Sequence, residues 1–144
     1  MPAYAVGDNK KKTQTGFAVK HVISIIALGM VLFHFYTAGS GVFTAVVQRS
    51  LHLGFALVLI FLLFPRAKPG KVEVALAFAS ALTMLYVVAY HKELAERLAQ
   101  PGTLDLVFSV IATVLVLEAT RRSLGLALPV IALVFLAYAF YGHL

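Results

Sequence analysis

Residues 74–90 of this chain read VALAFASALTMLYVVAY, a stretch without a formal charge. A helix that crosses a bilayer needs about 20 predominantly apolar residues, within a range of about 17–25. Glu73 lies just before the stretch, where the dipole of a beginning helix favours a carboxylate. Residues 74–90 therefore predict one transmembrane helix.

The composition extends this prediction to the whole chain. Of its 144 residues, 61% are hydrophobic and 12% are charged. Soluble domains have about 45–50% apolar and about 25% charged residues, and a small domain buries only part of its surface. We therefore expect an all-α integral membrane protein, with a basic cytoplasmic segment over residues 1–21 and a single transmembrane domain over residues 22–144.

Four further apolar runs flank the first one, and together they predict a bundle of about five transmembrane helices. The breaks between them are a Gly-Ser-Gly turn, a proline, a Pro-Gly pair and two arginines. Because more apolar runs follow, the first is better explained as an uncleaved helix than as a signal peptide. The predicted spans are about 22–38, 42–64, 74–90, 104–120 and 124–141.

The distribution of lysine and arginine predicts the orientation, because cytoplasmic loops carry an excess of both residues. With the N-terminus in the cytoplasm, nine basic residues lie inside and three lie outside. The C-terminus then lies in the periplasm of a bacterial inner membrane. The inside set is Lys10, Lys11, Lys12, Lys20, Arg66, Lys68, Lys71, Arg121 and Arg122, and the outside set is Arg49, Lys92 and Arg97.

Glu118 is the strongest candidate for a coupling carboxylate, because charges inside a membrane are costly and often functional. Arg121 and Arg122 follow it at i+3 and i+4, however, so a local ion pair would satisfy Glu118 without any transport role. The structural explanation is the stronger one. Glu118, Arg121 and Arg122 are also candidates for contact with a partner subunit. Pro129 is expected to kink the last span, as prolines inside helices do.

Gln48, Arg49 and His52 form a second candidate site, at positions i, i+1 and i+4 on one side of a helix. These three side chains could contact lipid headgroups or a partner subunit. The segment that contains them, residues 42–52, could either span the membrane or lie in its interface. His34, a single histidine in the first span, is expected to be a hydrogen-bonded packing residue. No two of the five histidines share a helix face, so no metal site is predicted.

The motifs of common enzymes are absent, and the chain is not expected to be an enzyme or to hold a cofactor. It has no Walker loop, no HExxH, no GxSxG and no Gly-rich dinucleotide turn. The net charge of +6 is explained by membrane orientation, so no nucleic-acid partner is expected. No inverted repeat of the kind found in secondary transporters is visible, which favours a scaffold over a transport pathway.

Two stretches resemble the small-subunit region of tripartite ATP-independent periplasmic (TRAP) transporters, with the TAXI branch as the nearest. One is QRSLHLGFAL at residues 48–57, continuing to FLLFP at 61–65. The other is LEATRRSLG at residues 117–125, continuing through Leu128-Pro129 to Phe140-Tyr141-Gly142. The resemblance covers about residues 20–142, and the second stretch is its more specific part.

The resemblance implies a small, Q-type scaffold subunit that anchors a large, multi-span, M-type permease in the membrane. In that family a periplasmic substrate-binding protein delivers an organic anion, typically a carboxylate. The large subunit carries the substrate and sodium sites. TAXI permeases often fuse the two parts, so this chain is either a separate subunit or a fragment. A different possibility is a self-sufficient homo-oligomeric transporter that is coupled to protons or sodium through Glu118.

Overall fold

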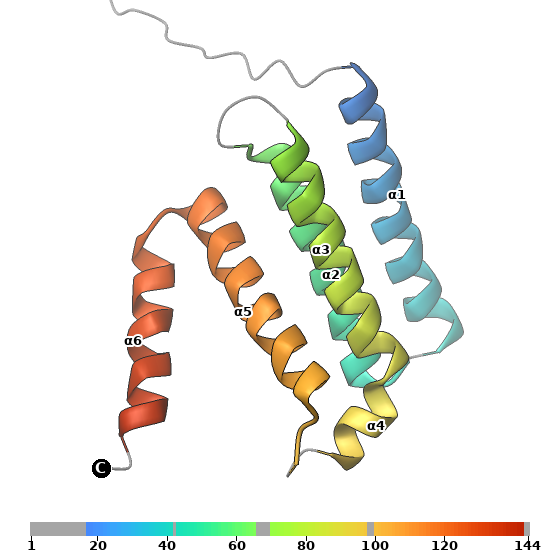
Figure 1. Ribbon diagram of the computed structural model, residues 1–144. Coiled ribbons are helices and arrows are strands. Elements are labelled where there is room, and N and C mark those ends of the chain that lie inside the picture. The colour runs from blue at the N-terminus through green and yellow to red at the C-terminus, as the bar shows by residue number, and fades with distance from the viewer. Residues whose placement is uncertain (1–16, 42, 66–69, 98–99, 143–144) are drawn as a thin grey trace, which may run out of the picture.

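The computed structural model describes residues 17–41, 43–65, 70–97 and 100–142, and all regular elements in these ranges are helices (Figure 1). The predicted all-α fold class is therefore confirmed. The helices are α1 (Phe17–Ser40), α2 (Ala45–Leu63), α3 (Lys71–Ala89), α4 (His91–Glu96), α5 (Thr103–Leu124) and α6 (Ala127–Tyr141).

Four of these helices are long and apolar enough to cross a membrane, namely α2, α3, α5 and residues 19–40 of α1. The fifth predicted span corresponds to α6, which has 15 residues. At 1.5 Å per residue α6 is about 22 Å long, whereas a bilayer core is about 30 Å thick. The count of five crossings and the sidedness of the termini therefore stay predictions.

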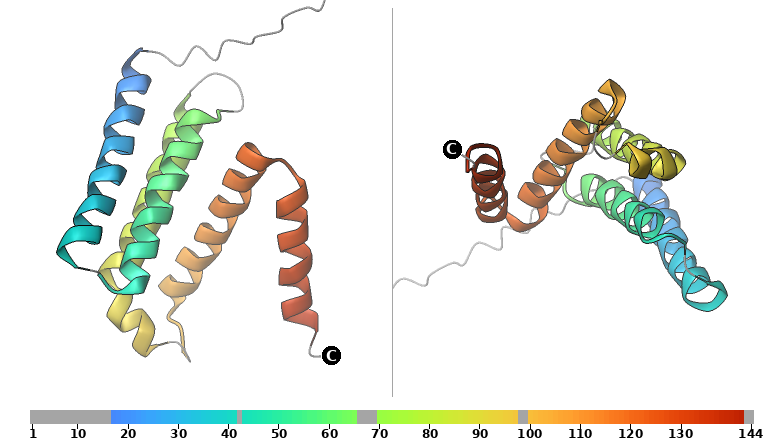
Figure 2. Two further views of the ribbon diagram at one scale, coloured as in Figure 1. Left: turned by 180° about the vertical axis from the view of Figure 1, so that it is seen from behind. Right: turned by 90° about the horizontal axis from the view of Figure 1, so that it is seen from below.

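The long helices form an open row rather than a closed bundle. Helices α2 and α3 pack against each other at the centre, with α1 against α2 on one side (Figure 2). Helix α5 contacts both α2 and α3, and α6 packs against α5 at the other edge of the row. The start of α1 and the end of α6 lie at opposite ends of the molecule (Figure 1).

The core lies where α2, α3 and α5 meet, and it is small. Leu57 and Phe61 of α2 are almost fully buried there, against Met84 of α3 and Leu115 of α5. Most other large apolar side chains point outward, and Phe35, Phe78 and Phe135 are each at least 69% exposed. A surface this apolar is unfavourable in water and favourable in lipid, so the described structure fits a membrane protein.

Small residues allow α2 and α3 to approach closely. A Cβ atom built on Gly54 would lie 3.1 Å from the Cβ atom of Met84. Ser80 and Thr83 of α3 are also buried, and each hydroxyl donates a hydrogen bond to a backbone carbonyl of its own helix. Small and hydroxyl side chains at such contacts are typical of helices packed within membranes.

Several helix ends differ from the predicted ones. Helix α1 begins at Phe17, five residues before the predicted first span, and residues 1–16 of the predicted N-terminal segment lie outside the described part. Residues 45–63 form one continuous helix. The two alternatives for residues 42–52, a membrane span or a position in the interface, both stay predictions. Tyr90 separates α3 from the short helix α4.

The expected kink at Pro129 is wrong. Helix α5 ends at Leu124, and Gly125 follows with a φ of 89°, a conformation that favours glycine. Helix α6 then begins at Ala127, which places Pro129 in its first turn. Backbone N–H groups of a first turn have no partner within the helix, so a proline there costs no hydrogen bond.

Candidate functional site

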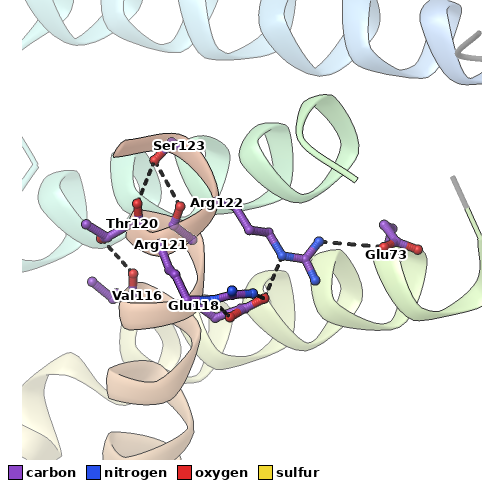
Figure 3. A network of polar contacts seen from close by, with 8 residues as sticks. Glu73, Val116, Glu118, Thr120, Arg121, Arg122 and Ser123 are labelled. Carbon is purple, nitrogen blue, oxygen red and sulfur yellow. Dashed lines mark hydrogen bonds and ion pairs between the residues drawn. The ribbon is translucent and has the colours of Figure 1, made fainter. Parts of the chain in front are cut away.

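Glu118, Arg121, Arg122 and Glu73 form a group that we call the Arg122 cluster (Figure 3). Arg121 donates hydrogen bonds from Nε to Glu118 Oε2 at 2.8 Å and from Nη2 to Oε1 at 3.0 Å. Arg122 Nε donates to Glu118 Oε1 at 2.7 Å. The predicted i,i+3 and i,i+4 ion pairs are thus confirmed, and both carboxylate oxygens of Glu118 accept hydrogen bonds from arginines.

Arg122 also links α5 to two other helices, which the sequence did not predict. Its Nη1 atom lies 3.6 Å from Oε1 of Glu73, in the first turn of α3 (Figure 3). Its guanidinium carbon lies 5.1 Å from the centroid of the Phe61 ring of α2, within the range of a cation–π contact. The Arg122 side chain is only 4% exposed, so three helices meet around one buried cation.

The chemistry of the Arg122 cluster favours a structural role. Two carboxylates and two guanidinium groups balance in charge, which is the arrangement in which buried ions are tolerated. Glu73 is held from the other side as well, because the backbone N–H of Gly70 donates a hydrogen bond to its Oε2 at 3.1 Å. Among the described residues, Arg122 Nη1 is a buried donor without a hydrogen bond, although it remains close to the Glu73 carboxylate.

A second polar contact joins α3 to α5 at the opposite end of the two helices. The hydroxyl of Tyr86 donates a hydrogen bond to Asp105 Oδ1 at 2.5 Å, and Gly102 N–H donates to Oδ2 at 2.8 Å. Arg97 Nη1 lies 3.8 Å from the same carboxylate. The sequence gave no sign of this contact, because Tyr86 and Asp105 lie on different helices.

The other predicted site residues lie around one hollow at the beginning of α2. Gln48, Arg49 and His52 line it together with Ala45, and His34 of α1 completes its wall. The hollow has a volume of about 440 Å³. We call it the polar hollow. The start of α2, where it lies, and the end of α5, which carries Arg122, are at opposite ends of the helix row (Figure 1).

His34 and His52 contact each other across the two helices. His34 Nδ1 lies 2.7 Å from the carbonyl oxygen of Met30, so this nitrogen carries the proton and donates. The Nε2 atom of His34 is then an acceptor, and His52 Nδ1, 3.0 Å away, is its donor. The pair was missed because its members are 18 residues apart on different helices, where spacing within one helix gives no signal.

The six predicted site residues therefore fall into two separate groups. Glu118, Arg121 and Arg122 belong to the Arg122 cluster, whereas Gln48, Arg49 and His52 belong to the polar hollow. Among the described residues, no group of three or more histidine, cysteine, aspartate or glutamate side chains is arranged to hold a metal ion. The interface role predicted for the six residues stays a prediction.

Comparison with known proteins gives no independent identification. No protein-family model matches the chain, and neither a curated protein nor a solved structure matches it.

Proposed function

We propose that this chain is the small membrane subunit of a TRAP-type secondary transporter in a bacterial inner membrane. In this role it anchors and supports a large permease subunit, which imports organic anions such as carboxylates with a coupling ion, expected to be sodium. A periplasmic substrate-binding protein supplies the anion. The chain itself contributes a scaffold rather than a substrate site.

The observation that carries the proposal is the position of the stretch 117–125, LEATRRSLG, which carries the more specific part of the resemblance. Its three charged residues form ion pairs within the chain: two lie within α5, and the pair between Arg122 and Glu73 joins α5 to α3. A carboxylate that carries a coupling ion must bind and release that ion during each cycle. Glu118 is instead held by two arginines, which favours a stationary scaffold over a self-sufficient transporter.

The exposed apolar surface supports the same role. Helices α1 and α6 form the two edges of the row, and each contacts the rest of the described structure mainly through one neighbouring helix. The open row thus leaves long apolar faces for lipid and for a membrane partner. A scaffold subunit requires such faces to contact its membrane partner.

The direct test is affinity purification of the tagged chain from its native membrane in mild detergent, with mass spectrometry of the proteins that accompany it. We expect a large multi-span permease at near one-to-one stoichiometry. Recovery of the chain alone as a stable homo-oligomer would contradict the proposal.

A second measurement separates the scaffold role from the alternative in which Glu118 couples transport. In the assembled complex, Glu118→Gln should retain substrate uptake, because the amide oxygen can still accept hydrogen bonds from the arginines and Glu73 still faces Arg122. Uptake that is lost while the complex still assembles would favour the alternative. The purified chain in liposomes should show no proton or sodium flux by itself.

A further inference from the structure

The polar hollow adjoins a second, apolar hollow, which is lined by α1 and by His52 of α2. His34 and His52 line both hollows, and the apolar one is completed by Met30, Val31, Phe35 and Ala38. The apolar hollow has a volume of about 370 Å³. The two histidines thus lie at a boundary between a polar surface and an apolar one, an arrangement that suits an amphiphilic ligand.

The polar hollow has the charge of an anion site. Arg49 is exposed there, and within the described part of the chain it forms no ion pair with a carboxylate. The amide of Gln48 lies on the same wall and can donate as well. Arginine binds phosphate through two parallel N–H donors, which makes it well suited to a phosphate group.

His52 lies at the boundary between the two hollows and is held there by its contact with His34. Its Nδ1–H donates to His34 Nε2, and its ring lines the walls of both hollows. The Met30 carbonyl fixes the proton of His34 at Nδ1, so His34 continues to accept from His52.

The depth of the hollow along the helices fits the headgroup region of a bilayer. Arg49 lies four residues after the first residue of α2, which is about 6 Å along the axis. Aromatic rings surround this end of the hairpin, with Phe33 stacked on Phe43 and Tyr36 beside Phe43. Aromatic side chains gather at the membrane interface, and long arginine side chains extend there toward phosphate groups.

We propose that the two hollows together bind one acidic phospholipid. Its phosphate contacts Arg49 and Gln48 beside the His52 ring, and one acyl chain lies along Met30, Val31 and Phe35. This site does not depend on the proposed transporter role. It also explains why Arg49, a basic residue predicted to lie outside, is found on the side that the positive-inside bias disfavours.

The test measures binding of phosphatidylglycerol to the purified full-length chain by native mass spectrometry, in parallel with phosphatidylcholine and inorganic phosphate. We expect selective retention of phosphatidylglycerol. Arg49→Gln should weaken this binding by about tenfold, as expected for the loss of a charge-assisted hydrogen bond. Lys92→Gln is the matched control, because Lys92 is an exposed cation outside both hollows and is predicted to lie on the same side of the membrane.

A second variant tests the acyl-chain part of the site. Val31→Trp fills the apolar hollow without changing any charge, and it should weaken phosphatidylglycerol binding while leaving the fold intact by circular dichroism. Three results would overturn the proposal. The first is that phosphatidylcholine binds as well as phosphatidylglycerol. The second is that Lys92→Gln and Arg49→Gln weaken phosphatidylglycerol binding equally. The third is that inorganic phosphate displaces the lipid while Val31→Trp has no effect on binding, which would indicate a site for an anion alone.

Discussion

At the scale of single residues, Arg122 is the side chain on which the packing of α5 depends most. Its side chain is 4% exposed and interacts with Glu118, Glu73 and the Phe61 ring. Arg122→Gln removes the charge that balances two carboxylates, and removing one partner of a buried ion pair destabilises proteins by about 3–5 kcal/mol. We expect a large fall in the midpoint of thermal unfolding, followed by circular dichroism in detergent.

Arg121 provides the control for this prediction. It contacts the same Glu118 carboxylate, but its side chain is 33% exposed and reaches no other helix in the contacts described. Exposed ion pairs contribute about 0–1 kcal/mol, so Arg121→Gln should shift the midpoint only slightly. Equal shifts in the two variants would show that the contact with Glu73 and Phe61 contributes little.

At the scale of helices, the close packing of α2 against α3 depends on Gly54. The added Cβ of Gly54→Ala would lie 3.1 Å from Met84 Cβ and 3.2 Å from its Cγ. Overpacking of this kind costs about 1–3 kcal/mol, which exceeds the gain in helix propensity of about 1 kcal/mol. We therefore expect Gly54→Ala to lower the unfolding midpoint or to leave it unchanged, measured by the same method.

Gly29 offers a matched comparison in the middle of α1. A Cβ atom there would meet only Phe55 Cε1, at 3.9 Å, an ordinary contact distance. Gly29→Ala should then stabilise the chain through helix propensity alone, by about 0.5–1 kcal/mol. If Gly54→Ala stabilised it by the same amount, the proposed close approach of α2 and α3 would be wrong.

The helices also show which features could be predicted from the sequence. The five apolar runs correspond to α1, α2, α3, α5 and α6, because composition alone determines where long apolar helices form. Ion pairs within one helix, such as Glu118 with Arg122, follow from spacing. Contacts between different helices do not follow from spacing along the sequence. The structure was therefore needed to find the contact of His34 with His52 and that of Tyr86 with Asp105.

At the scale of the whole molecule, α3 and α5 are joined at both ends by polar contacts. Glu73 meets Arg122 where α3 begins and α5 ends, and Tyr86 meets Asp105 near the other ends of the same helices. Helix α2 packs on both of them around Phe61 and Leu115. We interpret these three helices as one rigid unit, with α1 and α6 as more loosely attached edges (Figure 2).

The alternating directions of the long helices predict the orientation of the molecule in the membrane. Successive long helices alternate in direction, so that the start of α1, the end of α2, the start of α3 and the end of α5 share one end (Figure 1). These ends of α1, α3 and α5 carry Lys20, Lys71, Arg121 and Arg122. Arg49 lies near the start of α2 and Lys92 and Arg97 lie in or next to α4, at the other end of the molecule (Figure 1). The positive-inside rule therefore predicts that the first end faces the cytoplasm.

Reporter fusions in a bacterial host test this orientation and the crossing by α6 together. Alkaline phosphatase, which is active only in the periplasm, should be active when fused after Gly142 and inactive when fused after Gly125. A fluorescent protein that folds only in the cytoplasm should give the opposite pattern. Because α6 is about 22 Å long, shorter than the bilayer core, it must thin the bilayer locally or extend beyond its helical ends to cross. Cytoplasmic signals at both positions would mean that α6 does not cross and that the chain has four spans.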